Sequence, residues 1–103
     1  MEKDFEVTLN GNVLNVVLGR DLATANAPVL TGELAKYKGQ GVQKVVFDAT
    51  KLTFLASSGV RVVIFCKQKL GGSPEIVFVN CGKDIYDIFD ITGIRSFITF
   101  VEK

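Results

Sequence analysis

Apolar and polar residues alternate at the start of the chain, and this alternation predicts a strand. Phe5, Val7 and Leu9 recur at every second position, and Asn10-Gly11 follows them. An Asn-Gly pair between two apolar runs is typical of a tight β-hairpin turn. The second run, residues 13–18, is more continuously apolar, which indicates a strand nearer the centre of a sheet. The first eighteen residues therefore predict a hairpin whose second strand is the more buried.

After the hairpin, segments with apolar residues at helical spacing alternate with short, continuously apolar segments. The spacing predicts helices that begin near residues 24, 57 and 82. Buried strands are expected around residues 45–47, over 75–79, and in the closing segment SFITFV. Pro28 fits only in the first turn of the first helix, and Gly39 is suited to end it.

The order of these elements, β-β-α-β-α-β-α-β, indicates the fold class. Strands that alternate with helices imply an α/β fold with a largely parallel sheet and right-handed crossovers. We expect one domain over residues 1–103, with four to five strands in a mostly parallel or mixed sheet and three to four helices. No linker, repeat or low-complexity segment interrupts the pattern.

Composition argues against several classes of function. The chain has no histidine, so it lacks the usual general base and the commonest zinc ligand, which weighs against a hydrolase. We expect no catalytic residue, no cofactor and no metal site. Cys66 and Cys81 fall in apolar segments without C-x-x-C spacing, which favours reduced core residues of a cytoplasmic protein. The charged N-terminus and the lack of a run of about 20 apolar residues predict neither a signal peptide nor membrane insertion.

Charge is uneven along the chain although the net charge is only +1. Seven basic residues and one acid, Asp48, fall between Lys36 and Lys69. A nucleic-acid surface would need interleaved aromatic residues, so a solvated or partner-facing basic face is favoured. Three carboxylates, Asp84, Asp87 and Asp90, recur at helical spacing; acids near a helix start complement its dipole, which we favour over a metal site.

The stretch FLASSGV, residues 54–60, places two serines and a glycine where an apolar run ends and a helix begins. A serine at a helix start can cap one of the free backbone N–H groups. Capping explains one hydroxyl but not two followed by Gly59, which allows something to approach closely. Ser57 and Ser58 are therefore candidates for modification or partner contact. No G-x-S-x-G motif or phosphate-binding loop is present.

The helix after the serines is apolar almost all round. If Val60, Val63 and Ile64 face the sheet, then Arg61, Phe65 and Gln68 share the opposite face. Two interpretations remain open. Another element covers Phe65, or Arg61 and Phe65 extend a partner surface that begins at the serines.

The segment VVFDATKLTFLASSGVRVVI resembles the signature of STAS domains, the family of bacterial anti-sigma factor antagonists. In that signature a strand ending in Asp leads to Asp-Ser-Ser-Gly and a helix. ATANAP is similar to the family's first-helix start, and IYDIFDITGI to its third helix, so the resemblance extends over nearly the whole chain. The sequence departs from the pattern at Ala56, where the family has an acid, and in the order Asp21-Leu22.

The resemblance implies a regulator that binds an anti-sigma factor serine kinase. In the family the kinase phosphorylates the first serine of the pair, here Ser57, and the modified antagonist no longer binds. The second serine, Ser58, is expected to cap the helix. The implied partner-binding residues lie on three segments: Asp21, Asp48, Ser57, Ser58, Gly59, Arg61 and Phe65.

Two alternatives accompany this hypothesis. In the first, the protein is a STAS scaffold or transporter-associated subunit that binds its partner without phosphorylation, which Ala56 favours. In the second, Asp48 caps the turn after its strand instead of contacting a partner. We expect the protein to be a monomer or a weak dimer.

Overall fold

The structure, a computed structural model, describes residues 5–103. Within these residues, five strands and three α-helices follow the expected order, and two very short strands, β3 and β5, are additional. The strands are β1 (Phe5–Asn10), β2 (Val13–Leu18), β3 (Asp21–Leu22), β4 (Lys44–Asp48), β5 (Phe54–Leu55), β6 (Glu75–Val79) and β7 (Ile98–Val101). The helices are α1 (Ala27–Ala35), α2 (Ser57–Lys69) and α3 (Lys83–Ile91), and a 3₁₀ turn, η1 (Arg95–Phe97), precedes β7. The predicted α/β class is confirmed.

The main sheet is mixed and has five strands in the order β1-β2-β4-β6-β7. β1 is antiparallel to β2, and the other three pairs are parallel. The predicted hairpin is confirmed, with Asn10 opposite Val13 and Gly11 in the loop at a φ of 63°. Glycine adopts this left-handed conformation without steric cost. β2 lies between β1 and β4, which agrees with its more continuous apolar sequence.

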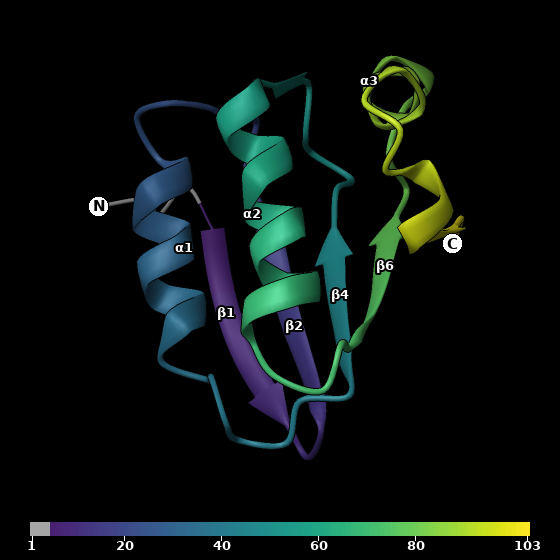
Figure 1. The fold of residues 1–103 in the computed structure, drawn as a ribbon. Coiled ribbons are helices and arrows are strands. Elements are labelled where there is room, and N and C mark those ends of the chain that lie inside the picture. Colours follow the sequence, from purple (N-terminus) through teal and green to yellow (C-terminus); the bar gives the residue numbers. More distant parts are fainter. Residues whose placement is uncertain (1–4) are drawn as a thin grey trace.

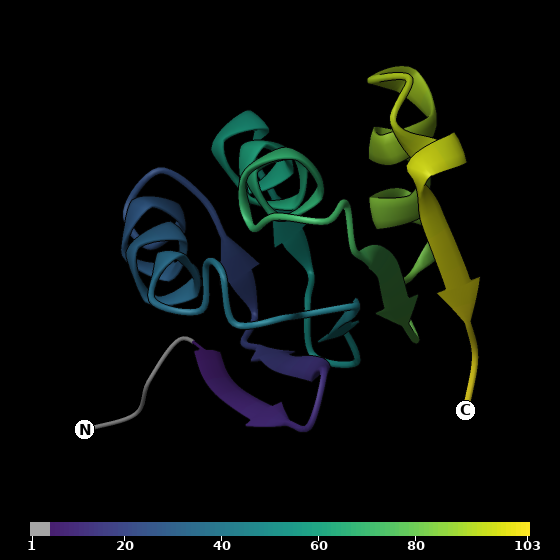
Figure 2. The same ribbon diagram turned by 60° about the horizontal axis from the view of Figure 1, so that its bottom comes forward.

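The three helices cover one face of this sheet. Figures 1 and 2 show α1 and α2 side by side over the sheet, with α3 beyond them near β6 and β7. The main core lies between these layers and includes Val16 on β2, Phe47 on β4 and Phe78 on β6. The rings of Phe47 and Phe78 stack with centroids 4.8 Å apart, and Phe89 of α3 meets Phe78 edge-on at 4.9 Å. Aromatic packing therefore joins α3 to the centre of the sheet.

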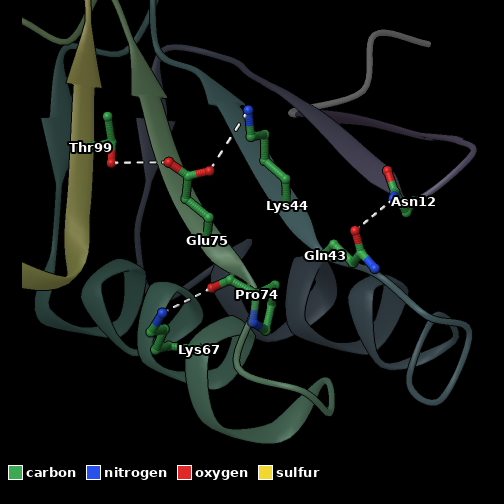
Figure 3. Close-up of polar contacts among 7 residues, drawn as sticks. All are labelled: Asn12, Gln43, Lys44, Lys67, Pro74, Glu75 and Thr99. Carbon is green, nitrogen blue, oxygen red and sulfur yellow. Dashed lines mark hydrogen bonds and ion pairs between the residues drawn. The ribbon is translucent and has the colours of Figure 1, made fainter.

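The amino ends of the strands are joined by polar contacts (Figure 3). Glu75 on β6 accepts a hydrogen bond from Thr99 at 3.3 Å and lies 3.7 Å from the Lys44 ammonium group. Lys67 near the end of α2 donates to the Pro74 carbonyl at 3.1 Å. Two residues of the basic middle segment thus have partners within the chain. None of the helices in residues 5–103 has the length and apolar character needed to cross a bilayer.

The first helix begins at Ala27 and not near residue 24 as predicted. Asn26 is a buried polar residue; its Oδ1 accepts from the Ala23 N–H at 2.8 Å, and its Nδ2 donates to the Asp21 carbonyl at 2.7 Å. These bonds hold the chain before Ala27 in turns, so the helix starts later. Pro28 lies in its first turn, as expected.

Candidate functional site at the start of α2

The start of α2 lies at the carboxyl edge of the sheet, where the arrows of β4 and β6 end in Figure 1. Open α/β sheets usually place functional groups at this edge. Two short strands position it, because β3 pairs with β5 in parallel and the Ala56 N–H donates to the Leu22 carbonyl at 2.9 Å. Ser57 is the first residue of α2 and is exposed, as predicted.

Gly59 lies in the interior, so its expected place on the partner surface is wrong. A Cβ atom at this position would lie 2.5 Å from Leu55 Cδ1 and 2.7 Å from the Leu22 carbonyl oxygen. These distances are shorter than ordinary van der Waals contact. The group that approaches Gly59 closely is therefore the β3–β5 pair of the same chain. Gly59 allows α2 to pack onto these strands, which fixes the position of Ser57.

Neither serine caps α2, and the expectation for Ser58 is therefore wrong. The N-cap residue is Ala56, whose extended backbone leads into the helix without a side-chain hydrogen bond. Ala56 supplies its carbonyl to the N–H groups of Gly59 and Val60, at 2.9 and 3.1 Å. The Ser58 Oγ atom is buried and has no hydrogen-bond partner within residues 5–103. Ser58 is the second residue of the helix, two positions after the N-cap, so it cannot act as the cap.

The outer face of α2 contains Ser57, Arg61 and Gln68, all of them exposed. Phe65 follows Arg61 by four residues on this side of the helix, but it is half-buried and packs against the core. Ile64, which was expected to face the sheet, is half-buried. Val62, which was not assigned to that side, is fully buried. The interpretation in which another part of the protein covers Phe65 is therefore supported for much of the ring. Arg61 remains one helical turn from Ser57, on the same face.

Phe54 is an exposed aromatic residue next to the site that sequence reasoning missed. Its side chain is 55% exposed, and it lies opposite the exposed Asp21 in the β3–β5 pair. The neighbouring Leu55 is buried, so the two residues alternate as in any strand. The only signal in the sequence was this alternation, over too few residues to reveal a strand. Exposed aromatic residues are common anchors in protein–protein interfaces.

Asp48 caps the turn that follows β4. Its Oδ1 accepts hydrogen bonds from the Thr50 hydroxyl at 2.6 Å and from the Thr50 N–H at 3.0 Å. These two bonds, helped by Lys103 and Lys51, lower the pKa of the Asp48 carboxyl group below its ordinary value. Thr50 in turn accepts from Asn80 Nδ2 at 3.1 Å. Since Phe47 points to the helices, Asp48 points to the other face of the sheet. The turn-capping alternative is confirmed.

The remaining candidate groups have structural partners. In α3, Asp87 pairs with Lys83 at 2.8 Å and Asp90 with Arg95 at 3.2 Å. No group of acids and cysteines in residues 5–103 has an arrangement that could hold a metal ion. Cys66 is buried and Cys81 half-buried, and both thiols are free. Burial raises the pKa of Cys66 to about 12, so this thiol stays protonated and unreactive at neutral pH.

The model of the STAS domain family matches residues 4–103. The chain belongs to the STAS domain family. Among curated proteins it is similar to BtrV of Bordetella bronchiseptica, which is named as an anti-sigma factor antagonist, with 34% identity over 74 residues. This match covers 71% of the present chain and 64% of BtrV, so it spans less than two thirds of that relative.

Several solved structures share the fold of this chain. The Bacillus anti-sigma factor antagonist SpoIIAA matches in its unphosphorylated form with a TM-score of 0.81, at 16% identity, covering 93% of this chain and 86% of SpoIIAA. The phosphorylated form of SpoIIAA matches with a TM-score of 0.73, also at 16% identity, covering 93% and 89%. The murine anion transporter Slc26a9 matches with a TM-score of 0.65 at 17% identity, covering 88% of this chain but only 16% of the transporter.

Proposed function

We propose that this STAS protein is a regulator of the anti-sigma factor antagonist type. It binds an anti-sigma factor serine kinase, and phosphorylation of Ser57 switches the binding off. The observation that carries the proposal is the exposure of Ser57 at the first position of α2, beside the exposed side chains of Asp21, Phe54 and Arg61. We expect the protein to act in the cytoplasm, as a monomer or weak dimer, without catalytic activity of its own.

Phosphorylation at Ser57 is compatible with the fold. A phosphoserine adds roughly −1.5 to −2 charges at neutral pH. At a helix N-terminus the helix dipole favours such an anion by about 0.3–1 kcal/mol. Against an acidic surface of the partner, the same charge would oppose binding. A penalty of about 3 kcal/mol would weaken the complex roughly a hundredfold.

The relatives support this direction. BtrV and SpoIIAA are named as anti-sigma factor antagonists, and SpoIIAA has been solved both with and without phosphorylation. Within α2, the first turn carries no acidic residue that would repel a phosphate.

The test uses the serine-kinase anti-sigma factor encoded nearest to this protein. The two proteins are incubated with ATP, the phosphorylated residue is found by mass spectrometry, and binding is measured by calorimetry. We expect one phosphate on Ser57, none in Ser57→Ala, and about hundredfold weaker binding of Ser57→Asp. Ser58→Ala is the matched control, because it changes the neighbouring hydroxyl and should leave phosphorylation intact. A phosphate on Ser58 alone would contradict the assignment.

A second candidate function follows from Ala56. The acid that precedes the serines in the family pattern is absent, which favours a STAS scaffold or transporter-associated subunit that binds its partner without phosphorylation. The similarity in fold to a part of an anion transporter is compatible with this function. Ala56→Asp separates the two candidates. If wild type is inert to the kinase and Ala56→Asp is phosphorylated on Ser57, the missing acid limits the kinase; if both are inert, the scaffold function is favoured.

A further inference from the structure

We infer that Arg61 is the residue that pairs with the phosphate on Ser57 and that it takes part in the switch. This inference rests on the proposed function, because it assumes that Ser57 is modified. It gives Arg61, already placed beside Ser57, a role in the switch that the serine alone does not provide.

Helix geometry brings the two side chains together. Ser57 and Arg61 are four residues apart in α2, so they are neighbours on one face of the helix. Long side chains in helices lean toward the helix N-terminus, over the residues three and four positions earlier. The Arg61 side chain therefore leans toward Ser57 and Ser58. The guanidinium group presents several N–H donors in a plane, which is suited to phosphate oxygens.

The local charges leave Arg61 available for this role. Arg61 is exposed and takes part in none of the ion pairs found among residues 5–103. The first turn of α2 contains no acid, and Ala56 provides no carboxylate in front of it. β5 contacts α2, and β5 is itself contacted by β3 and α3. The charged residues on or beside these three elements include Arg20, Asp21, Lys51 and Asp84.

The pairing would change the surface in two ways at once. In the unmodified protein, Arg61 offers a positive charge beside a neutral hydroxyl. After phosphorylation, the new anion faces the partner and Arg61 is occupied by the phosphate. The charge of the Ser57–Arg61 pair thus passes from about +1 to between about −0.5 and −1 at neutral pH. A partner with an acidic group opposite Arg61 would lose an attraction and gain a repulsion.

The experiment measures the pairing directly and needs neither kinase nor partner. Phosphoserine is introduced at position 57 of the full chain by genetic encoding, and the phosphate is titrated by ³¹P NMR. A nearby cation stabilises the dianion, so we expect its midpoint to lie about 0.4 pH lower with Arg61 than in Arg61→Gln. Arg61→Lys should keep most of this difference. Lys69→Gln is the matched control, since it removes one exposed positive charge from the far end of the same helix and should leave the midpoint unchanged.

Two results would overturn the inference. Either Arg61→Gln leaves the phosphate midpoint unchanged, or Lys69→Gln shifts it as much, which would indicate net charge and not a local pair. A second measurement needs no phosphate: in urea unfolding of Ser57→Asp, Arg61→Gln and the double variant, a local pair should give a coupling of roughly twofold in the unfolding equilibrium constant, and its absence would also count against Arg61. If the kinase does not phosphorylate Ser57 but the titration shows the expected difference in midpoint, the proposed function is rejected and the pairing of Arg61 with the phosphate stands.

Discussion

At the carboxyl edge of the sheet, the turn after β4 and the start of α2 differ in how far their polar groups are hydrogen-bonded. At the end of β4, the Asp48 carboxylate, both Thr50 donors and the Asn80 amide bond to one another. At the start of α2, Ala56 offers no side-chain cap and the Ser58 hydroxyl is buried without a partner in residues 5–103. The polar groups of the turn after β4 thus have hydrogen-bond partners within the chain. The start of α2 is held by packing, and its polar side chains make no such bonds within residues 5–103.

The difference indicates how the fold can carry a modifiable residue. The Asp48 turn is stabilised by its own hydrogen bonds. The start of α2 is positioned by the contact of Gly59 with Leu22 and Leu55, which does not involve Ser57. Chemistry at Ser57 can therefore change without altering the contacts that fix the helix.

The largest expected effect comes from filling the space at Gly59. Gly59→Ala would force a methyl group against the Leu22 carbonyl and the Leu55 side chain. Overpacking outweighs the better helix propensity of alanine, so we expect a loss of about 2 kcal/mol in the free energy of unfolding, measured in urea. Gly32→Ala in α1 is the control, because a Cβ atom there meets nothing within 4 Å. That variant should gain up to about 1 kcal/mol. Equal effects of the two variants would refute packing at Gly59.

Removal of the unpaired hydroxyl should stabilise the protein. Ser58→Ala eliminates a buried oxygen without a hydrogen bond and increases helix propensity, so we expect a gain of about 1.5 kcal/mol in urea unfolding. This sign is opposite to that expected for a capping serine. Ser57→Ala, at an exposed position, is the control and should change stability by less than about 0.5 kcal/mol. A loss of stability in Ser58→Ala would show that its hydroxyl has a partner.

An acidic residue at position 56 should cap the N-terminus of α2. Ala56→Asp introduces a good N-cap residue and an anion near the helix dipole, so we expect a gain of about 1 kcal/mol. Thermal and urea unfolding measure the gain, and Ala56→Asn tests capping without charge. If neither variant is more stable than wild type, the N–H groups at the start of α2 have other acceptors.

The smallest expected effect concerns Asp48 in the turn after β4. Because the pKa of Asp48 is lower in the folded protein than its ordinary value of 3.8, its ionised form stabilises the fold above that pH, and the contribution is lost as the pH falls through the folded pKa. Asp48 is largely solvated, so the contribution should be less than about 0.5 kcal/mol. Asp48→Asn should flatten the stability profile below pH 4, compared with Asp87→Asn in α3. An unchanged profile would indicate that Thr50 binds both states of the carboxyl group equally.

Sequence periodicity predicted the elements that are long enough to show it. The alternation in β1 and the apolar spacing in α2 gave strands and helices of the right type, since burial on one face imposes that pattern. β3 and β5 have two residues each and leave no periodic signal, although they position Ser57 and expose Phe54. The late start of α1 depends on Asn26, whose side-chain bonds reach back to Asp21 and cannot be read from local spacing.

For the site residues too, features set by local sequence were predicted and features set by tertiary contacts were not. The exposure of Ser57 was predicted, because a polar residue at the first position of a helix seldom enters the core. The expectations for Gly59 and Ser58 were wrong because each depends on contacts with other segments: β3 and β5 pack against Gly59, and the N-cap lies at Ala56. The sequence left two interpretations of Phe65 open, and its partial burial depends on the core beneath it. Only tertiary packing determines these.

The order of strands in the sheet also has a kinetic consequence. Among the paired strands of residues 5–103, only β1 and β2 are joined by a tight turn. Each parallel pair of the main sheet forms only after a helix and its loops have closed, which is slow. The β3–β5 pair joins two segments on opposite sides of α1 and β4 in the sequence, so it is expected to form after them. Ser57 would then reach its exposed position only when the rest of the domain has assembled. A protein that recognises this corner would distinguish completed molecules from those still folding.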